Sequence, residues 1–227
     1  MVRKPASGVA ENPLAAVSLL HLLLILFGTT LRPLSAMSQP ATRTTDFLDQ
    51  LTADLRDIQT TVAQRFQPLT DDQLNRRPGP GRWSVGQCLE HLNIIGGLYL
   101  PVITRKIQQA QTRSSRPAEA VKRGLLGRRL TNAMRVPSSE KATKTPQQYA
   151  PSGSRLPRTV VEVFNRQTEE LLALLQQARA VNINTVRIPN VVIALLRLRL
   201  TDQLELLVVH AQRHIQQAER VLDGSGK

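Results

Sequence analysis

Three histidines are the residues of this sequence best suited to do chemistry. His210 and His214 lie four residues apart in a segment with helical apolar spacing. Two side chains at that separation share one face of a helix, with Cβ atoms about 6 Å apart, so both imidazoles can reach one metal ion. His91 lies in a second, distant segment of the same kind. If the two helices face each other, the three imidazoles form an open metal site with a free position for water or substrate.

Each histidine also has an ordinary interpretation. Two histidines at helical spacing arise by chance on any exposed face, and a lone His91 is more often a hydrogen-bonded core residue than a ligand. Scarcity argues for the metal site, because segment 37–227 contains only these three histidines and all of them fall on predicted helices.

The neighbours of the histidines supply few further candidates. Gln87 precedes His91 by one turn and Gln217 follows His214 by nearly one turn, so either amide could orient a ligand or a substrate. The alternatives are a helix cap for Gln87 and a surface amide for Gln217. Glu90 points about 100° away from His91 on a helix, so we assign no catalytic residue. Cys88, the only cysteine, excludes an intramolecular disulfide and a cysteine-rich zinc site, and reads as a small core residue.

Four amphipathic segments must position these side chains. Their apolar residues recur mostly at steps of three and four, which predicts helices that each bury one stripe. Ser84 and Gln87 form a capping box at the start of the second helix, Thr201 is the expected cap of the last, and Gly224 its expected end. Gly96, Gly97 and Pro101 should bend or weaken the second helix. The helices are predicted at 45–66, 84–103, 157–180 and 201–223, and segment 181–200 fits either a short helix or extended packing.

Helices of this kind pack together as a four-helix bundle, so the predicted fold class is all-α. The connection between the second and third helices is too long for a hairpin, and a crossover would leave those two helices parallel. Segment 105–158 holds 13 lysines and arginines against two acids, a net charge of +11. That charge suits a nucleic acid or an anionic lipid, while the Ser, Pro, Thr and Gln content favours a solvated loop with a short helix near 125–134.

Composition and the N-terminus bound the remaining possibilities. The chain has 227 residues and a net charge of +13, and its seven aromatic residues are too few for a platform that stacks single-stranded nucleic acid. Residues 14–27 form an apolar run that is short for a membrane span. We therefore divide the chain into 1–36, a signal-like segment or a mis-assigned upstream extension, and the bundle domain 37–227. A start at Met37 predicts a cytoplasmic protein, and the alternative is export or anchoring through 14–31.

Two motifs resemble a known family. The stretch RWSVGQCLEHL at 82–92 and the stretch HAQRHIQQ at 210–217 are similar, as a pair, to the signatures of the DinB-like metal-binding superfamily. The stretch TPQQYAPS at 145–152 resembles the approach to that family's third helix. The resemblance covers about 44–223 and implies an up-down-down-up four-helix bundle. It also implies a divalent metal, with zinc, nickel and iron as candidates, on His91, His210 and His214.

The resemblance implies several activities rather than one. Some members of the family are thiol transferases, others are metal-dependent hydrolases, and a related group that builds sulfur–carbon bonds has glutamate where this chain has Gln216. We expect a metal-dependent transferase or hydrolase that acts on a small-molecule substrate, for which a low-molecular-weight thiol is one candidate. A second copy of the chain, in a homodimer, is the other expected partner. A non-catalytic, metal-stabilised bundle and an adaptor that binds nucleic acid or membranes through 105–158 are the alternatives.

Overall fold

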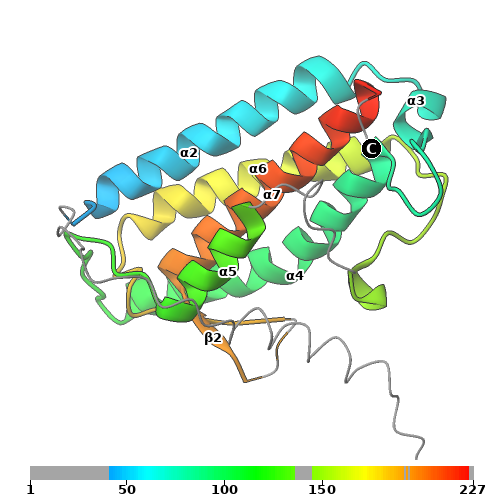
Figure 1. Ribbon diagram of the computed structural model, residues 1–227. Helices are drawn as coiled ribbons and strands as arrows, with labels where there is room; N and C mark the ends of the chain where they lie inside the picture. Colours follow the sequence, from blue (N-terminus) through cyan, green and yellow to red (C-terminus); the bar gives the residue numbers. More distant parts are fainter. Residues whose placement is uncertain (1–40, 136–144, 192, 194, 225–227) are drawn as a thin grey trace, which may run out of the picture. The chain divides into compact units, whose positions relative to one another are not determined.

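Four long helices make up most of the protein. The computed structural model describes residues 41–135, 145–191, 193 and 195–224, which all fall in one compact unit, Ser38–Lys227. The four helices pack against one another around a single apolar core (Figure 1), and a turn of π-helix at Val62–Phe66 extends the first. The all-α prediction is confirmed. The helices are α2 (Thr44–Thr61), α4 (Val85–Thr112), α6 (Thr159–Ala178) and α7 (Leu200–Leu222).

The predicted apolar stripes form this core. α2 and α4 each contact both α6 and α7, so every long helix buries its stripe against two others. Leu48, Val62 and Phe66 of the first stripe are no more than 1% exposed. Burying a side chain of this size contributes roughly 1.5–3 kcal/mol, which explains why a strong apolar period predicts these helices well.

α4 begins as predicted but runs further. The Ser84 hydroxyl accepts a hydrogen bond from the Gln87 amide at 3.2 Å, and the Gln87 side chain accepts one from the Ser84 amide at 3.1 Å. The helix is not interrupted at Gly96, Gly97 or Pro101 and continues to Thr112. Glycine at position 96 lets the side chain of Gln167 approach the backbone of α4, since a Cβ there would lie 2.3 Å from that side chain.

α7 starts differently from the prediction. Thr201 does not cap the helix, which begins at Leu200 after Arg199. The Thr201 hydroxyl instead donates to the Asn184 side chain at 3.1 Å, a tertiary partner that competes with capping. The predicted end is correct, because Gly224 has a φ of +68° just after the helix, a conformation that glycine adopts without strain.

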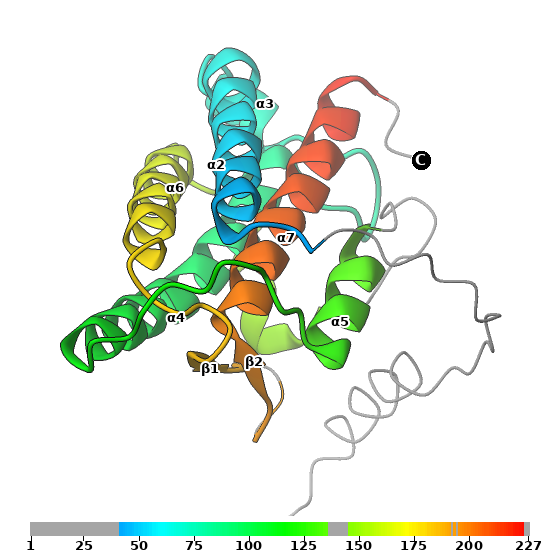
Figure 2. The ribbon, with the colours of Figure 1, turned by 90° about the vertical axis from the view of Figure 1, so that its left-hand side faces the viewer.

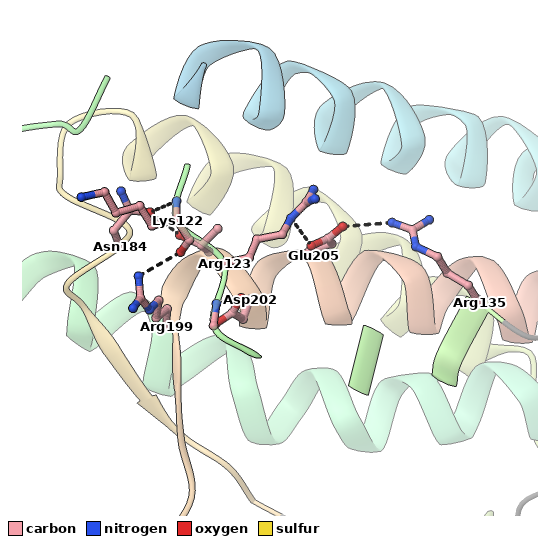
Figure 3. A network of polar contacts seen from close by, with 9 residues as sticks. Lys122, Arg123, Arg135, Asn184, Arg199, Asp202 and Glu205 are labelled. Carbon is pink, nitrogen blue, oxygen red and sulfur yellow. Dashed lines mark hydrogen bonds and ion pairs between the residues drawn. The ribbon is translucent and has the colours of Figure 1, made fainter. Parts of the chain in front are cut away.

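The basic connection contains the short helix that the sequence predicts. That helix, α5 (Leu125–Arg135), packs against the outer side of α7. Glu205 of α7 accepts ion pairs from Arg123 at 2.9 Å and from Arg135 at 3.0 Å (Figure 3). Asp202 accepts a hydrogen bond from the Gly124 amide at 2.9 Å. Part of the positive charge of 105–158 is therefore neutralised by buried acids of α7.

Segment 181–200 forms the extended structure that was one of its two interpretations. β1 (Arg187–Pro189) and β2 (Arg197–Arg199) pair antiparallel, with Ile188 opposite Leu198. Two short helices were not predicted: α3 (Asp71–Asn75), which a capping box starts, and the 3₁₀ turn η2 (Gln147–Tyr149). Both lie in segments too short for a clear apolar period.

No helix in the described ranges is both long enough and apolar enough to cross a bilayer. The apolar run 14–27 and the rest of 1–36 lie outside the described residues.

Candidate metal centre

The structure brings the three predicted histidines together. His91 comes from α4, and His210 and His214 come from α7. Nε2 of His210 lies 3.2 Å from Nε2 of His91 and 3.1 Å from Nε2 of His214. One ligand atom from each residue falls within 4.8 Å of the others, so the group could hold a metal ion. Two histidines at helical spacing and a third from the facing helix thus meet as their positions in the sequence predict.

The outer ring nitrogens fix the orientation of two of these imidazoles. Nδ1 of His91 donates to the Tyr149 carbonyl at 2.8 Å, and Nδ1 of His214 donates to the Gln217 side-chain oxygen at 3.0 Å. A proton on Nδ1 leaves the lone pair on Nε2, the atom that faces the other histidines. Hydrogen-bonded outer nitrogens of this kind are typical of histidines that bind metals.

Burial keeps the three imidazoles neutral. His91 and His214 are 5% and 8% exposed, and His210 is half-buried. Desolvation is the main cause that lowers all three pKa values, and it takes the pKa of His210 to about 3. Mutual repulsion and the charge of Arg213 lower the pKa values of His210 and His214 further. A metal ion would therefore displace no proton from these residues at neutral pH.

Trp83 covers one side of the histidine cluster. Its indole ring stacks on His214 with centroids 5.6 Å apart, and it lies 5.1 Å from the ring of His91 at a tilt of 47°. The ring is half-buried and packs against the core. Its place just before α4 fits the end of a bundle, and its contact with the imidazoles also shields them from water.

The first turns of α4 hold the segment that orients His91. Gln87 donates to the Gly153 carbonyl at 2.9 Å, and Glu90 accepts from the Ser152 amide at 2.9 Å. The amide of Gln87 serves the helix cap and this segment, and its described hydrogen bonds do not reach a histidine. Gln217, in contrast, contacts His214 directly. Sequence reasoning missed the Tyr149 carbonyl, because a backbone acceptor leaves no trace in residue type.

Neither a reactive thiol nor a further metal ligand accompanies the three histidines in the described part of the chain. Cys88 is fully buried, and desolvation raises the pKa of its thiol to about 12, so the thiol stays protonated. Among the described residues, no aspartate, glutamate or cysteine joins the three histidines within metal-ligand reach. The centre therefore offers imidazole nitrogens alone.

A small cavity adjoins His210. It measures about 50 Å³ and lies between α2, α4, α6 and α7. Apart from His210, Gln167 and Thr168, its walls are apolar or glycine, so the space suits a small apolar group. The apolar wall residues are Leu55, Leu92, Ile95, Leu100, Phe164, Leu171, Leu207 and Ala211, with Gly96 at the α4 side.

Comparison with known proteins agrees with this architecture. A family model described as the DinB superfamily matches residues 54–218, which include all three histidines, the whole of α4 and α6, and parts of α2 and α7. No curated protein and no solved structure gives a match. Because the family model spans most of the chain, this protein belongs to the DinB superfamily.

Proposed function

We propose that the protein is a metal-dependent enzyme that acts on a small molecule through His91, His210 and His214. The observation that carries this proposal is the convergence of three Nε2 atoms, two of them on rings whose Nδ1 atoms are already hydrogen-bonded. Structural zinc sites usually have four protein ligands, so a set of three favours a site with a position left for substrate.

The donor set fits a divalent ion. Neutral imidazole suits zinc, nickel and iron, the three candidates for this centre. When bound, such an ion acts as a Lewis acid and lowers the pKa of a water or thiol that it binds. Tyr149 and Gln217 keep the two rings in place, and Trp83 limits the access of water from its side.

Thiol transfer is the reaction that we favour. Hydrolysis calls for a general base beside the water, and no carboxylate of the described residues joins the histidine group. Thiol activation needs only the metal and a positive environment, which the charge of Arg213 supplies to His210 and His214. The apolar cavity beside His210 would take a small apolar part of the electrophile or of the thiol.

We also propose the helix order that the family resemblance implies, up-down-down-up. The courses of the ribbons in Figure 1 support it, because α2 and α7 run toward one end of the bundle while α4 and α6 run toward the other. In this order α4 and α7 are antiparallel, which lets His91 near the start of α4 meet His210 at the middle of α7 and His214 about one turn later.

A substitution at the centre tests the proposed enzyme. Protein purified without a histidine tag is analysed for bound metal, and turnover is measured with glutathione or cysteine and chlorodinitrobenzene as the electrophile. His210→Ala should remove metal and turnover together, while Gln216→Ala, an exposed neighbour on the same helix, should change neither. Turnover that survives His210→Ala would exclude the proposal. Metal binding that raises the melting temperature, with no turnover of any tested thiol, would favour a structural metal.

A further inference from the structure

The β1–β2 hairpin has two chemically different faces. Ile188 and Leu198 point inward and are buried, at 0% and 3% exposed. Arg187 and Arg197 lie on the opposite face and are exposed. Successive strand residues alternate between faces, so the paired strands present an arginine face to solvent over an apolar underside.

The described residues between the two strands include several apolar side chains that are not fully buried. Leu195 is 100% exposed, and Val191, Ile193 and Leu196 are half-buried. Between Ala180 and Thr201 the sequence has three arginines and no acid. Single exposed leucines are ordinary on soluble surfaces, so Leu195 is informative only together with its apolar and basic neighbours.

A second apolar and basic segment adjoins this hairpin. Arg199 donates to the Lys122 carbonyl at 3.1 Å, which places the base of the hairpin beside the start of α5. Leu125, the first residue of α5, is 69% exposed, and Lys122 is also exposed. Figures 1 and 2 both show the strands projecting beyond the helices at the end of the molecule where α5 begins. Leu195 and Leu125 are therefore exposed leucines of two elements that adjoin at the base of the hairpin, and each has basic residues near it in the sequence.

From this arrangement we infer that the hairpin end is a membrane-binding surface that inserts Leu195 and Leu125 into the interface of an anionic bilayer. Arg187, Arg197 and Lys122 contact the lipid headgroups, whose negative charge complements this end of the protein. The apolar residues enter only the headgroup and upper acyl region, as the short turn allows. This binding would bring the protein to a lipid surface independently of the activity of the histidine centre.

The same observations argue against other occupants of this surface. A nucleic acid would use the positive charge but would gain nothing from exposed leucines, and the hairpin offers no aromatic ring for base stacking. A second copy of the chain that met this end symmetrically would place arginine against arginine. An anionic lipid surface accounts for the leucines and the arginines together.

A local fluorescent probe tests the inference in the full chain. Cys88 is fully buried with a pKa of about 12, so a cysteine introduced by Leu195→Cys is the site that an environment-sensitive nitrobenzoxadiazole dye labels. The matched control is Leu98→Cys, at an exposed leucine in the middle of α4, far from the hairpin in the sequence. Labelled proteins are mixed with vesicles of phosphatidylcholine alone or with phosphatidylglycerol added.

We expect a blue shift at position 195 with anionic vesicles, and no shift with neutral vesicles or at position 98. The double variant Arg187→Glu, Arg197→Glu should weaken partitioning more than tenfold, since one basic residue near the surface contributes about fivefold. Three results would overturn the inference: no shift at 195, equal shifts at 195 and 98, or a shift that ignores vesicle charge. An apolar spectrum at 195 before vesicles are added would also overturn it, because another protein segment would then cover the turn. Binding of duplex DNA through the same arginines without a vesicle response would point to nucleic acid instead.

Discussion

The stability of the metal-free protein should fall steeply as the pH drops below the ordinary pKa of histidine. Burial lowers the pKa of His210 from 6.5 to about 3. Below pH 6.5 the unfolded chain therefore binds a proton at this residue and the folded protein does not. Protons then favour the unfolded state, so the free energy of unfolding decreases as the pH falls from neutral toward the folded pKa. His91 and His214 shift in the same direction, also because of burial.

The size of this effect follows from proton linkage. When the pH falls from about 7 to about 5.5, His210 becomes protonated in the unfolded chain only. This protonation lowers the free energy of unfolding by about 1.2 kcal/mol. His210 stays neutral in the folded protein over this interval, because its pKa of about 3 lies well below it. His91 and His214 act in the same direction, so the whole protein should lose more stability over this interval than His210 alone accounts for.

Urea denaturation at the two pH values checks this expectation. Protein treated with a chelator is compared with the His210→Gln variant, which has no titrating group at that position. The wild type should lose about 1 kcal/mol more than the variant when the pH is lowered. Equal losses in the two proteins would refute the reasoning, because His210 would then titrate alike in the folded and unfolded states.

Three further substitutions or treatments have definite outcomes. Gly127→Ala should destabilise the protein by about 1–2 kcal/mol, although alanine has the better helix propensity, because a Cβ would lie 2.4 Å from Cβ of Asp202. Thermal melts should show this loss. They should show no such loss for Gly153→Ala, where the atom nearest to an added Cβ is 4.0 Å away. Tyr149→Phe removes a hydroxyl that donates to the hairpin backbone at 2.6 Å, so urea denaturation should show a loss of about 1 kcal/mol. The Cys88 thiol should react with a thiol reagent only after unfolding, which a colorimetric assay in and out of denaturant measures, and fast reaction of the native protein would contradict its burial.

Local patterns predicted the parts of the fold that depend on local physics. The stripe that includes Leu48 and Phe66 indicated a buried helix face, and the Ser84 and Gln87 pair indicated a helix start. Each signal comes from residues that are three or four positions from the next one in the sequence, so a local pattern is enough to find it. The meeting of His91 with His210 required more than periodicity. Scarcity of histidine and the family resemblance suggested it, and the packing of α4 on α7 brings it about.

Predictions failed where a distant residue competes with a local signal. Thr201 has the residue type of a helix cap, but its hydroxyl is used by Asn184, so the helix starts without it. Gly96 looks like a helix breaker, yet the side chain of Gln167 occupies the space that a Cβ would fill. In each case the decisive partner is far away in the sequence, which no local pattern can reveal.

The long helices alone do not fix the geometry of the candidate metal centre. The ring of His91 depends on the carbonyl of Tyr149, a residue outside the bundle helices, whose hydroxyl is tied to the backbone of Val191 at the base of the hairpin turn. Gln87 and Glu90 hydrogen-bond the residues that follow Tyr149, and with His91 they lie within an arc of about 100° around α4. This side of α4 therefore binds the segment that follows Tyr149 and also supplies the imidazole of His91 to the candidate metal centre. Because His91 is oriented through Tyr149 while His214 is oriented within α7 by Gln217, loosening the Tyr149 segment should disturb one ligand and leave the other in place.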